Sequence, residues 1–102
     1  MIVEIADLSI QPGQQASFLT AFAAASKVIA RATGYRQHVL QHCLERDTRF
    51  VLLVEWETLE DHTEGFRQSP LFAEWRALIG PYFAAPPTVE HFAQVWPTGQ
   101  TC

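Results

Sequence analysis

The spacing of hydrophobic residues in the first third of the chain predicts a strand followed by a helix. Ile2 to Leu8 is short and apolar, with β-branched residues at three positions, and a Gln-Pro-Gly turn signal at residues 11–13 stops it. From Gln14 onward the apolar residues recur every three or four positions, as they do on one face of a helix. Gly34 then predicts the end of the helix as a left-handed cap. The residues on the apolar face are Phe18, Phe22, Ala25, Ile29 and Ala32.

Two alternating segments follow and predict a hairpin. Tyr35 to Leu44 and Phe50 to Glu57 both alternate as strands do, and the polar residues 45–49 between them have the length of a hairpin loop. On the second of these strands the even-numbered residues are apolar, yet Val51 and Leu53 on the opposite face are apolar too. Both faces of the sheet are therefore expected to be buried against other parts of the structure.

The next segment predicts two short helices. Thr58 and Asp61, three positions apart, are typical of a capping box at a helix start. Ser69-Pro70 is a second start, with proline at the first helical position. The glycine and prolines of residues 80–87 end this second helix.

The complete order of elements predicts an α+β fold of the ferredoxin-like type, βαββαβ, with Thr88 to Trp96 as the fourth strand. Such a chain forms a four-stranded antiparallel sheet with its helices on one face. We expect residues 1–96 to make a single domain and residues 97–102 a C-terminal tail. Because the helices cover one face only, the other is expected to meet the same face of a second copy in a homodimer. A thick loop cover within a monomer is the alternative.

The charge balance narrows the choice of partners. Eleven Asp and Glu against seven Lys and Arg give a formal net charge of −4, without a basic cluster, so neither nucleic acid nor a membrane is expected as a partner. The N-terminus lacks a basic signal-peptide region and no apolar run could span a bilayer, which predicts a cytoplasmic protein. Cys43 and Cys102 are expected to be free thiols.

Residues 50–91 contain an apolar strand, a tryptophan, a polar break, two short helical patterns and another strand. This part of the chain resembles the antibiotic biosynthesis monooxygenase (ABM) domain, whose Trp-Glu-Ser/Thr motif stands here as Trp56-Glu57-Thr58. The resemblance covers nearly the whole chain, through a loose pattern of residue types. It implies a dimeric α+β barrel and an oxygenase that needs no cofactor.

The same resemblance places Trp56 where an indole can line the binding site of a flat aromatic ligand and donate a hydrogen bond to it. A tryptophan that only packs in the core would also fit at this position. His62, early in the following helix, is the candidate base, and Arg76 could stabilise an enolate or phenolate oxygen, as could Arg67. His91 is a further candidate for the cavity wall. The aromatic residues expected to line the cavity or the core are Phe66, Phe72, Trp75 and Phe83.

No metal or haem site is expected. His38 and His42 would lie roughly 13 Å apart on a strand, too far to share an ion. The haem-degrading relatives use an axial histidine, whose place is taken here by Trp75 or Arg76, and a first-strand asparagine, whose place is taken by Asp7. Both residues of the haem site are therefore absent, and haem oxygenase activity is not expected.

The expected function is therefore a cofactor-independent monooxygenation of a small phenol, quinol or polyketide-like compound by O2. Such a reaction requires only that the protein bind the ring, favour its anion and exclude water. A dimeric module that binds a hydrophobic metabolite and an isomerase of small phosphorylated carbonyl compounds remain alternatives. Basic residues around the cavity would favour the isomerase, whereas an aromatic cavity with His62 or Arg76 would favour the oxygenase.

Overall fold

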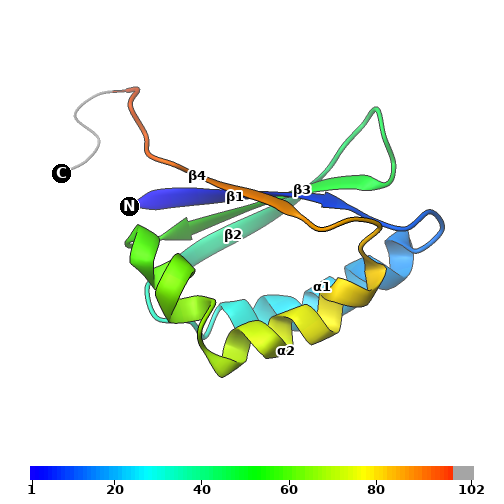
Figure 1. Ribbon diagram of the computed structural model, residues 1–102. Helices are drawn as coiled ribbons and strands as arrows, with labels where there is room; N and C mark the ends of the chain where they lie inside the picture. Colours follow the sequence, from blue (N-terminus) through cyan, green and yellow to red (C-terminus); the bar gives the residue numbers. More distant parts are fainter. Residues whose placement is uncertain (98–102) are drawn as a thin grey trace.

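A single antiparallel sheet dominates the computed structural model, which describes residues 1–97 (Figure 1). Its strands are β1 (Ile2–Ser9), β2 (Tyr35–His42), β3 (Arg49–Trp56) and β4 (Thr88–Phe92), in the spatial order β2-β3-β1-β4. This order, with every pair of neighbours antiparallel, confirms the predicted ferredoxin-like α+β fold.

All helices lie on one side of the sheet, with α1 and α2 side by side beneath it (Figure 1). They are α1 (Gln15–Ile29), the π-helix η1 (Asp61–Phe66), α2 (Pro70–Ile79) and the short 3-10 helix η2 (Gly80–Tyr82). No helix among residues 1–97 has the length and apolar character needed to cross a bilayer.

Both predicted starts of the short helices are confirmed. The backbone N–H of Thr58 donates to Asp61 Oδ2 at 3.2 Å, and the backbone N–H of Asp61 donates to Thr58 Oγ1 at 3.1 Å, so the two residues cap the helix reciprocally. Ser69 is the N-cap of α2 and Pro70 its first residue. The first of these helices continues as a π-helix, a feature that its sequence did not predict.

The end of α1 differs from the prediction. The helix ends at Ile29, and its last turns tighten through bonds from Arg31 N–H to Val28 O and from Ala32 N–H to Ile29 O. Gly34 has the left-handed φ of +81° that was expected, but it lies in the turn that leads into β2. A Cβ there would fall 2.1 Å from Asp61 Oδ2, so glycine also permits the capping box to approach.

Two strands are shorter than predicted. β2 ends at His42, after which Cys43 N–H bonds to Arg49 O across the hairpin and Leu44 is exposed. β4 ends at Phe92 instead of Trp96, because Phe92 already pairs with Val3, close to the start of β1. Beyond that point β4 has almost no strand left to pair with. The predicted tail at residues 97–102 lies outside the described residues from 98 onward, as does Cys102, whereas Cys43 is a free cysteine.

The sheet has one buried and one open face. The even-numbered residues of β3 are all buried beneath the helices, whereas its odd-numbered residues are only partly covered. Val39 of β2 and Phe92 of β4 are 51% and 49% exposed on the open side. We call this surface the open sheet face; its apolar residues are Val3, Ile5, Val39, Val51, Leu53 and Phe92.

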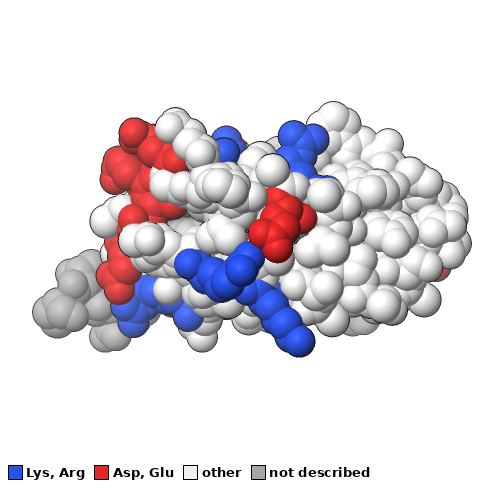
Figure 2. Space-filling model, turned by 90° about the horizontal axis from the view of Figure 1, so that it is seen from below, with Lys and Arg blue, Asp and Glu red and all other residues white. Residues whose placement is uncertain are grey.

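The helical side carries its charge unevenly. In Figure 2, which looks at the molecule from below, Asp and Glu gather near the end where η1 lies, whereas the surface of the opposite end shows almost no charged residue. The sequence explains this difference, because residues 10–26 and 77–89 contain no charged residue. Charged groups of the helical layer are therefore concentrated around η1 and the middle of the molecule.

Replacing Gly34 by alanine should destabilise the protein by about 2 kcal/mol. The left-handed conformation alone costs a residue with a Cβ about 1–2 kcal/mol, and the clash with Asp61 would disturb the capping box as well. Gly80→Ala is the matched control, since Gly80 has a helical φ of −55° and open space around its Cβ position. Urea unfolding should show a lower midpoint for Gly34→Ala only; equal midpoints for both variants would contradict this explanation.

Candidate active site

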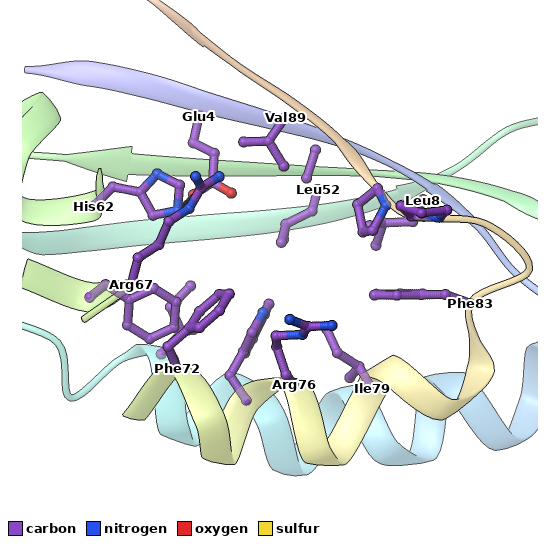
Figure 3. Close-up of a pocket in the computed structure, with 16 residues that line it drawn as sticks. Glu4, Leu8, Leu52, His62, Arg67, Phe72, Arg76, Ile79, Phe83 and Val89 are labelled. Atoms are coloured by element: carbon purple, nitrogen blue, oxygen red, sulfur yellow. Dashed lines mark ion pairs between the residues drawn. The ribbon is translucent and has the colours of Figure 1, made fainter. Parts of the chain in front are cut away.

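A cavity of about 270 Å³ lies between the sheet and the helices. Strands β1, β3 and β4 form its upper wall, and the lower wall comes from α1, η1, α2 and the segment that leads into β4 (Figure 3). Its volume is near the lower end of the range of about 300–1,000 Å³ found for small-molecule sites, which suits a small ligand. The lining residues are Glu4, Ala6, Leu8, Ile29, Leu52, His62, Phe66, Arg67, Phe72, Trp75, Arg76, Ile79, Phe83, Pro86, Pro87 and Val89.

Aromatic rings make up much of the lower wall. Phe66 meets Phe72 edge to face, with ring centroids 5.5 Å apart, and meets Trp75 in the same way at 6.2 Å. Phe83 closes the opposite end of the cavity (Figure 3). The structure thus brings the four aromatic residues predicted from the sequence to one cavity. Edge-to-face packing fixes the rings of Phe66, Phe72 and Trp75, which form a firm apolar surface for a flat ligand.

A buried carboxyl group lies at the polar end of the cavity. Glu4 of β1 is only 5% exposed, and its Oε1 accepts a hydrogen bond of 3.0 Å from Trp56 Nε1. His62 Nε2 lies 3.3 Å from the same oxygen. The sequence interpretation did not select Glu4, although one signal was available: Glu4 shares the inward register of Ala6 and Leu8 on a central strand, where a charged residue is unexpected.

A second histidine continues this network. His62 Nδ1 and His91 Nε2 are 2.8 Å apart, and His91 is the cross-strand partner of Glu4. The His62 ring also stacks on Trp56, with centroids 5.2 Å apart and planes inclined by 23°. We call Glu4, Trp56, His62 and His91 the buried polar group. Its members come from β1, β3, η1 and β4, so it ties four elements together.

Burial sets the protonation of this group. It lowers the pKa of His62 to about 4, and the nearby Arg67 and His91 act in the same direction. Burial raises the pKa of Glu4, an effect opposed by the bond from Trp56 and by the charge of Arg67. His62 is therefore neutral near pH 7, and its 3.3 Å approach to Glu4 Oε1 is a polar contact, not an ion pair. With the His62 proton on Nε2, the nitrogen that faces the Glu4 carboxyl group, Nδ1 accepts from His91.

Two arginines border the cavity. Arg67 reaches toward Glu4 and His62, and Arg76 rises from α2 in the middle of the lower wall (Figure 3). The Arg76 guanidinium carbon lies 5.9 Å from the centre of the Phe72 ring. Neither arginine forms an ion pair with a carboxylate in the part of the chain that the structure describes. Both remain available to an anionic group of a ligand.

Two of the residues predicted to bind substrate lie behind the wall. Trp56 is fully buried and does not line the cavity, because Glu4 and the stacked His62 ring cover it. His91 faces the helical side as expected, but its ring contacts His62 instead of the cavity. Both residues therefore reach the cavity only through their contacts with Glu4 and His62.

The remaining histidines have structural partners. His38 Nε2 lies 2.7 Å from Ser26 Oγ of α1 and its Nδ1 bonds to the Tyr35 hydroxyl, while His42 Nε2 bonds to the Asp47 carbonyl. No cluster of three or more His, Cys, Asp or Glu with metal-binding geometry occurs within residues 1–97. In the buried polar group, His62 turns opposite ring nitrogens to its two partners, so the three side chains do not converge on one point.

Comparisons with known proteins identify relatives of this chain by sequence and by structure. The family model of the antibiotic biosynthesis monooxygenases matches residues 1–78. YczJ of Bacillus subtilis (strain 168), an uncharacterized protein, is 47% identical over 95 residues, which cover 93% of this chain and all of YczJ. A crystal structure from Bordetella bronchiseptica, named as a candidate antibiotic biosynthesis monooxygenase, is 42% identical with a TM-score of 0.89, over 92% of this chain and 96% of that one.

A more distant structure shares the fold. SnoaB of Streptomyces nogalater, a cofactor-independent oxygenase, is 18% identical with a TM-score of 0.78, over 94% of this chain and 96% of SnoaB. At this identity the likeness concerns the fold alone. Together, the family match over most of the chain and the similarity to YczJ and the Bordetella protein show that this chain belongs to the antibiotic biosynthesis monooxygenase (ABM) family.

Proposed function

We propose that the chain is a monooxygenase that oxidises a small phenol, quinol or related aromatic compound with O2 and without a cofactor. The observation that carries the proposal is the cavity itself, which combines a firm aromatic wall with an unpaired arginine and a buried carboxyl group. Membership of the ABM family supports the reaction class. The cytoplasmic location stays a prediction from the sequence.

The chemistry requires the ring to become an anion first. A base removes the acidic proton, and the anion then transfers an electron to O2, giving a substrate radical and superoxide that combine into a peroxide. Loss of water from the peroxide leaves a carbonyl group, so one oxygen atom enters the product and the other leaves as water. The substrate supplies all the electrons, and the protein has to position the ring and stabilise its anion.

The residues at the cavity fit these tasks. Arg76 lies on the lower wall, where its guanidinium can stabilise the phenolate or enolate oxygen. Proton removal takes place at the polar end, where His62 and Glu4 lie. The aromatic wall around them holds the ring and excludes water, which strengthens the electrostatic effect of the arginine.

A second candidate, an isomerase of small anionic carbonyl compounds, is favoured by one observation. Arg67 and Arg76 both border the cavity, and two cations could hold a phosphate or carboxylate. The aromatic rings of Phe66, Phe72 and Trp75 form too apolar a wall for a compact phosphorylated sugar, so we place this function second. A module that only binds an aromatic metabolite is the third possibility, and loss of turnover with retained binding would distinguish it.

We also propose that the protein is a homodimer joined through the open sheet face. The apolar residues of this surface are partly uncovered on strands that are central in the sheet, such as Val51 and Leu53 on β3. Charged residues border it, among them Glu55 and the pair of Asp7 with Arg49. An apolar patch with a polar rim is typical of an interface between two copies.

Oxygen uptake should increase when the protein is mixed with members of a panel of dihydroxynaphthalenes and anthrones. Arg76→Gln should lower turnover roughly a hundredfold, as expected for the loss of one stabilising group at a developing anion. Arg36→Gln is the control, because Arg36 pairs with Glu57 on the edge strand, away from the cavity. Uptake no faster than in buffer across the whole panel would leave the binding module as the better description.

Light scattering should give the mass of a dimer at micromolar concentration. Val39→Glu should shift the protein toward the monomer, because it places a charge among the apolar residues of the proposed interface. Leu19→Glu introduces the same charge at a residue of α1 that is 46% exposed, and should leave the mass unchanged. A stable wild-type monomer, or equal dissociation by both variants, would rule out the open sheet face as the interface.

A further inference from the structure

We infer that Glu4 is the residue that takes the substrate's proton, and that His62 is a positioning residue that holds Glu4 in place. The inference rests on the proposed function for the class of substrate, an aromatic compound with an acidic O–H or C–H bond. It goes beyond that function because it assigns the proton transfer to a residue that neither the sequence pattern nor the family motif singles out.

Both ring nitrogens of His62 already have partners. Its Nε2 lies 3.3 Å from Glu4 Oε1, and its Nδ1 lies 2.8 Å from His91 Nε2. The ring borders the cavity, but the nitrogen lone pair that a base requires is directed to His91. His62 is therefore poorly placed to accept a proton from a ligand, although it is the only histidine on the cavity wall within residues 1–97.

Glu4 has a free oxygen at the cavity. Trp56 donates to Oε1 and His62 Nε2 lies 3.3 Å from the same oxygen, whereas Oε2 has no hydrogen bond to any residue among positions 1–97. No buried polar side-chain atom in this part of the chain lacks a partner, so Oε2 is not sealed in the protein. Glu4 is one of the cavity-lining residues, and Oε2 therefore opens into the cavity. The bond from Trp56 and the contact with His62, both at Oε1, fix the direction in which Oε2 points.

The groups around Glu4 suit a carboxylate that must act as a base. Burial in the sheet raises the pKa of Glu4 and so strengthens it as a base, while the N–H of Trp56 and the charge of Arg67 oppose this rise. The titratable and charged groups that face it are His62 from η1, Arg67 just after η1, His91 from β4 and Arg76 from α2. No second carboxylate lines the cavity within the described residues.

The proton transfer itself is simple. The acidic O–H or C–H bond of the substrate breaks, its electron pair stays on the substrate as a phenolate or enolate, and the proton forms an O–H bond with Glu4 Oε2. Arg76, on the same cavity, can stabilise the new oxyanion. When O2 later oxidises the anion to the peroxide, Glu4 can return this proton to the oxygen that leaves as water. The carboxylate is then restored for another turnover.

Proton transfer can be measured separately from oxidation. Without O2, an enzyme that ionises anthrone should exchange the acidic methylene hydrogens of anthrone for deuterium in D2O, which NMR detects. Wild type should accelerate this exchange over buffer, and Glu4→Gln should abolish the acceleration while keeping the shape of the side chain. Glu45→Gln should exchange at the wild-type rate, because Glu45 is an exposed residue of the loop between β2 and β3 and does not line the cavity.

Two more variants test the roles in detail. His62→Phe removes the N–H donor but keeps a stacking ring on Trp56, so the pKa of Glu4 should rise and the acid limb of the exchange rate should move to higher pH. His62→Gln, which can donate to Glu4, should restore most of the wild-type profile. In folded Glu4→Ala, added formate should restore exchange, because a small carboxylate can occupy the space that the substitution creates.

The outcomes separate this inference from the proposed function. If exchange depends on Glu4 but no compound of the panel causes oxygen uptake, Glu4 is supported as the base and the oxygenase function is ruled out. Oxygen uptake and exchange unchanged in Glu4→Gln would keep the oxygenase and overturn the inference. No acceleration of exchange by wild type, or a folded Glu4→Ala that formate does not rescue, would overturn it as well.

Discussion

The burial of one carboxyl group, that of Glu4, constrains much of the structure around the cavity. A buried charge without partners costs on the order of several kcal/mol, so the fold must supply hydrogen-bond donors and cations at this point. Trp56 donates from the end of β3, His62 of η1 lies in polar contact with the same oxygen, and Arg67 adds a positive charge nearby. The tryptophan that marks the family motif therefore has a role that is visible in this chain: it satisfies the buried acid.

The position of η1 follows from the same requirement. His62 reaches Glu4 because the helix begins directly after β3, where Thr58 and Asp61 cap it. Gly34 allows this cap to pack against the turn before β2. Within the helix, the bond from Arg67 N–H to His62 O widens the turn into a π-helix, a form that is often found at functional sites. Local backbone features thus place the side chains that the carboxylate needs.

Much of the fold could be predicted from the sequence, because local patterns determine it. The alternation in β3, the steps of three and four in α1 and the two helix starts are each encoded within a few residues. The ends of β2 and β4 were predicted less well, because they depend on how far a partner strand extends. Gly34 shows the same limit: its φ could be predicted, but its contact with Asp61 could not.

The site was only partly predictable, because part of it depends on contacts between residues that are distant in the sequence. The aromatic residues and Arg76 were found because the local pattern predicted short helices covering the sheet in this part of the chain. Trp56, His62 and His91 were also predicted as site residues, but Glu4 and the contacts among these four were not, since Glu4 and Trp56 are 52 positions apart and His62 and His91 are 29 apart. Only the strand register brings these residues together. A glutamate in the inward register of β1 was the one local sign of it.

The protonation state of His62 tests this description most directly. We expect NMR of the imidazole nitrogens to show His62 neutral, with its proton on Nε2, at pH 7 and to place its pKa at about 4. Since this pKa lies below the ordinary value of 6.5, the contribution of His62 to stability is present above pH 6.5 and is lost as the pH falls toward 4. If His62 titrates near 6.5, or carries its proton on Nδ1 at pH 7, the buried polar group is not arranged as described.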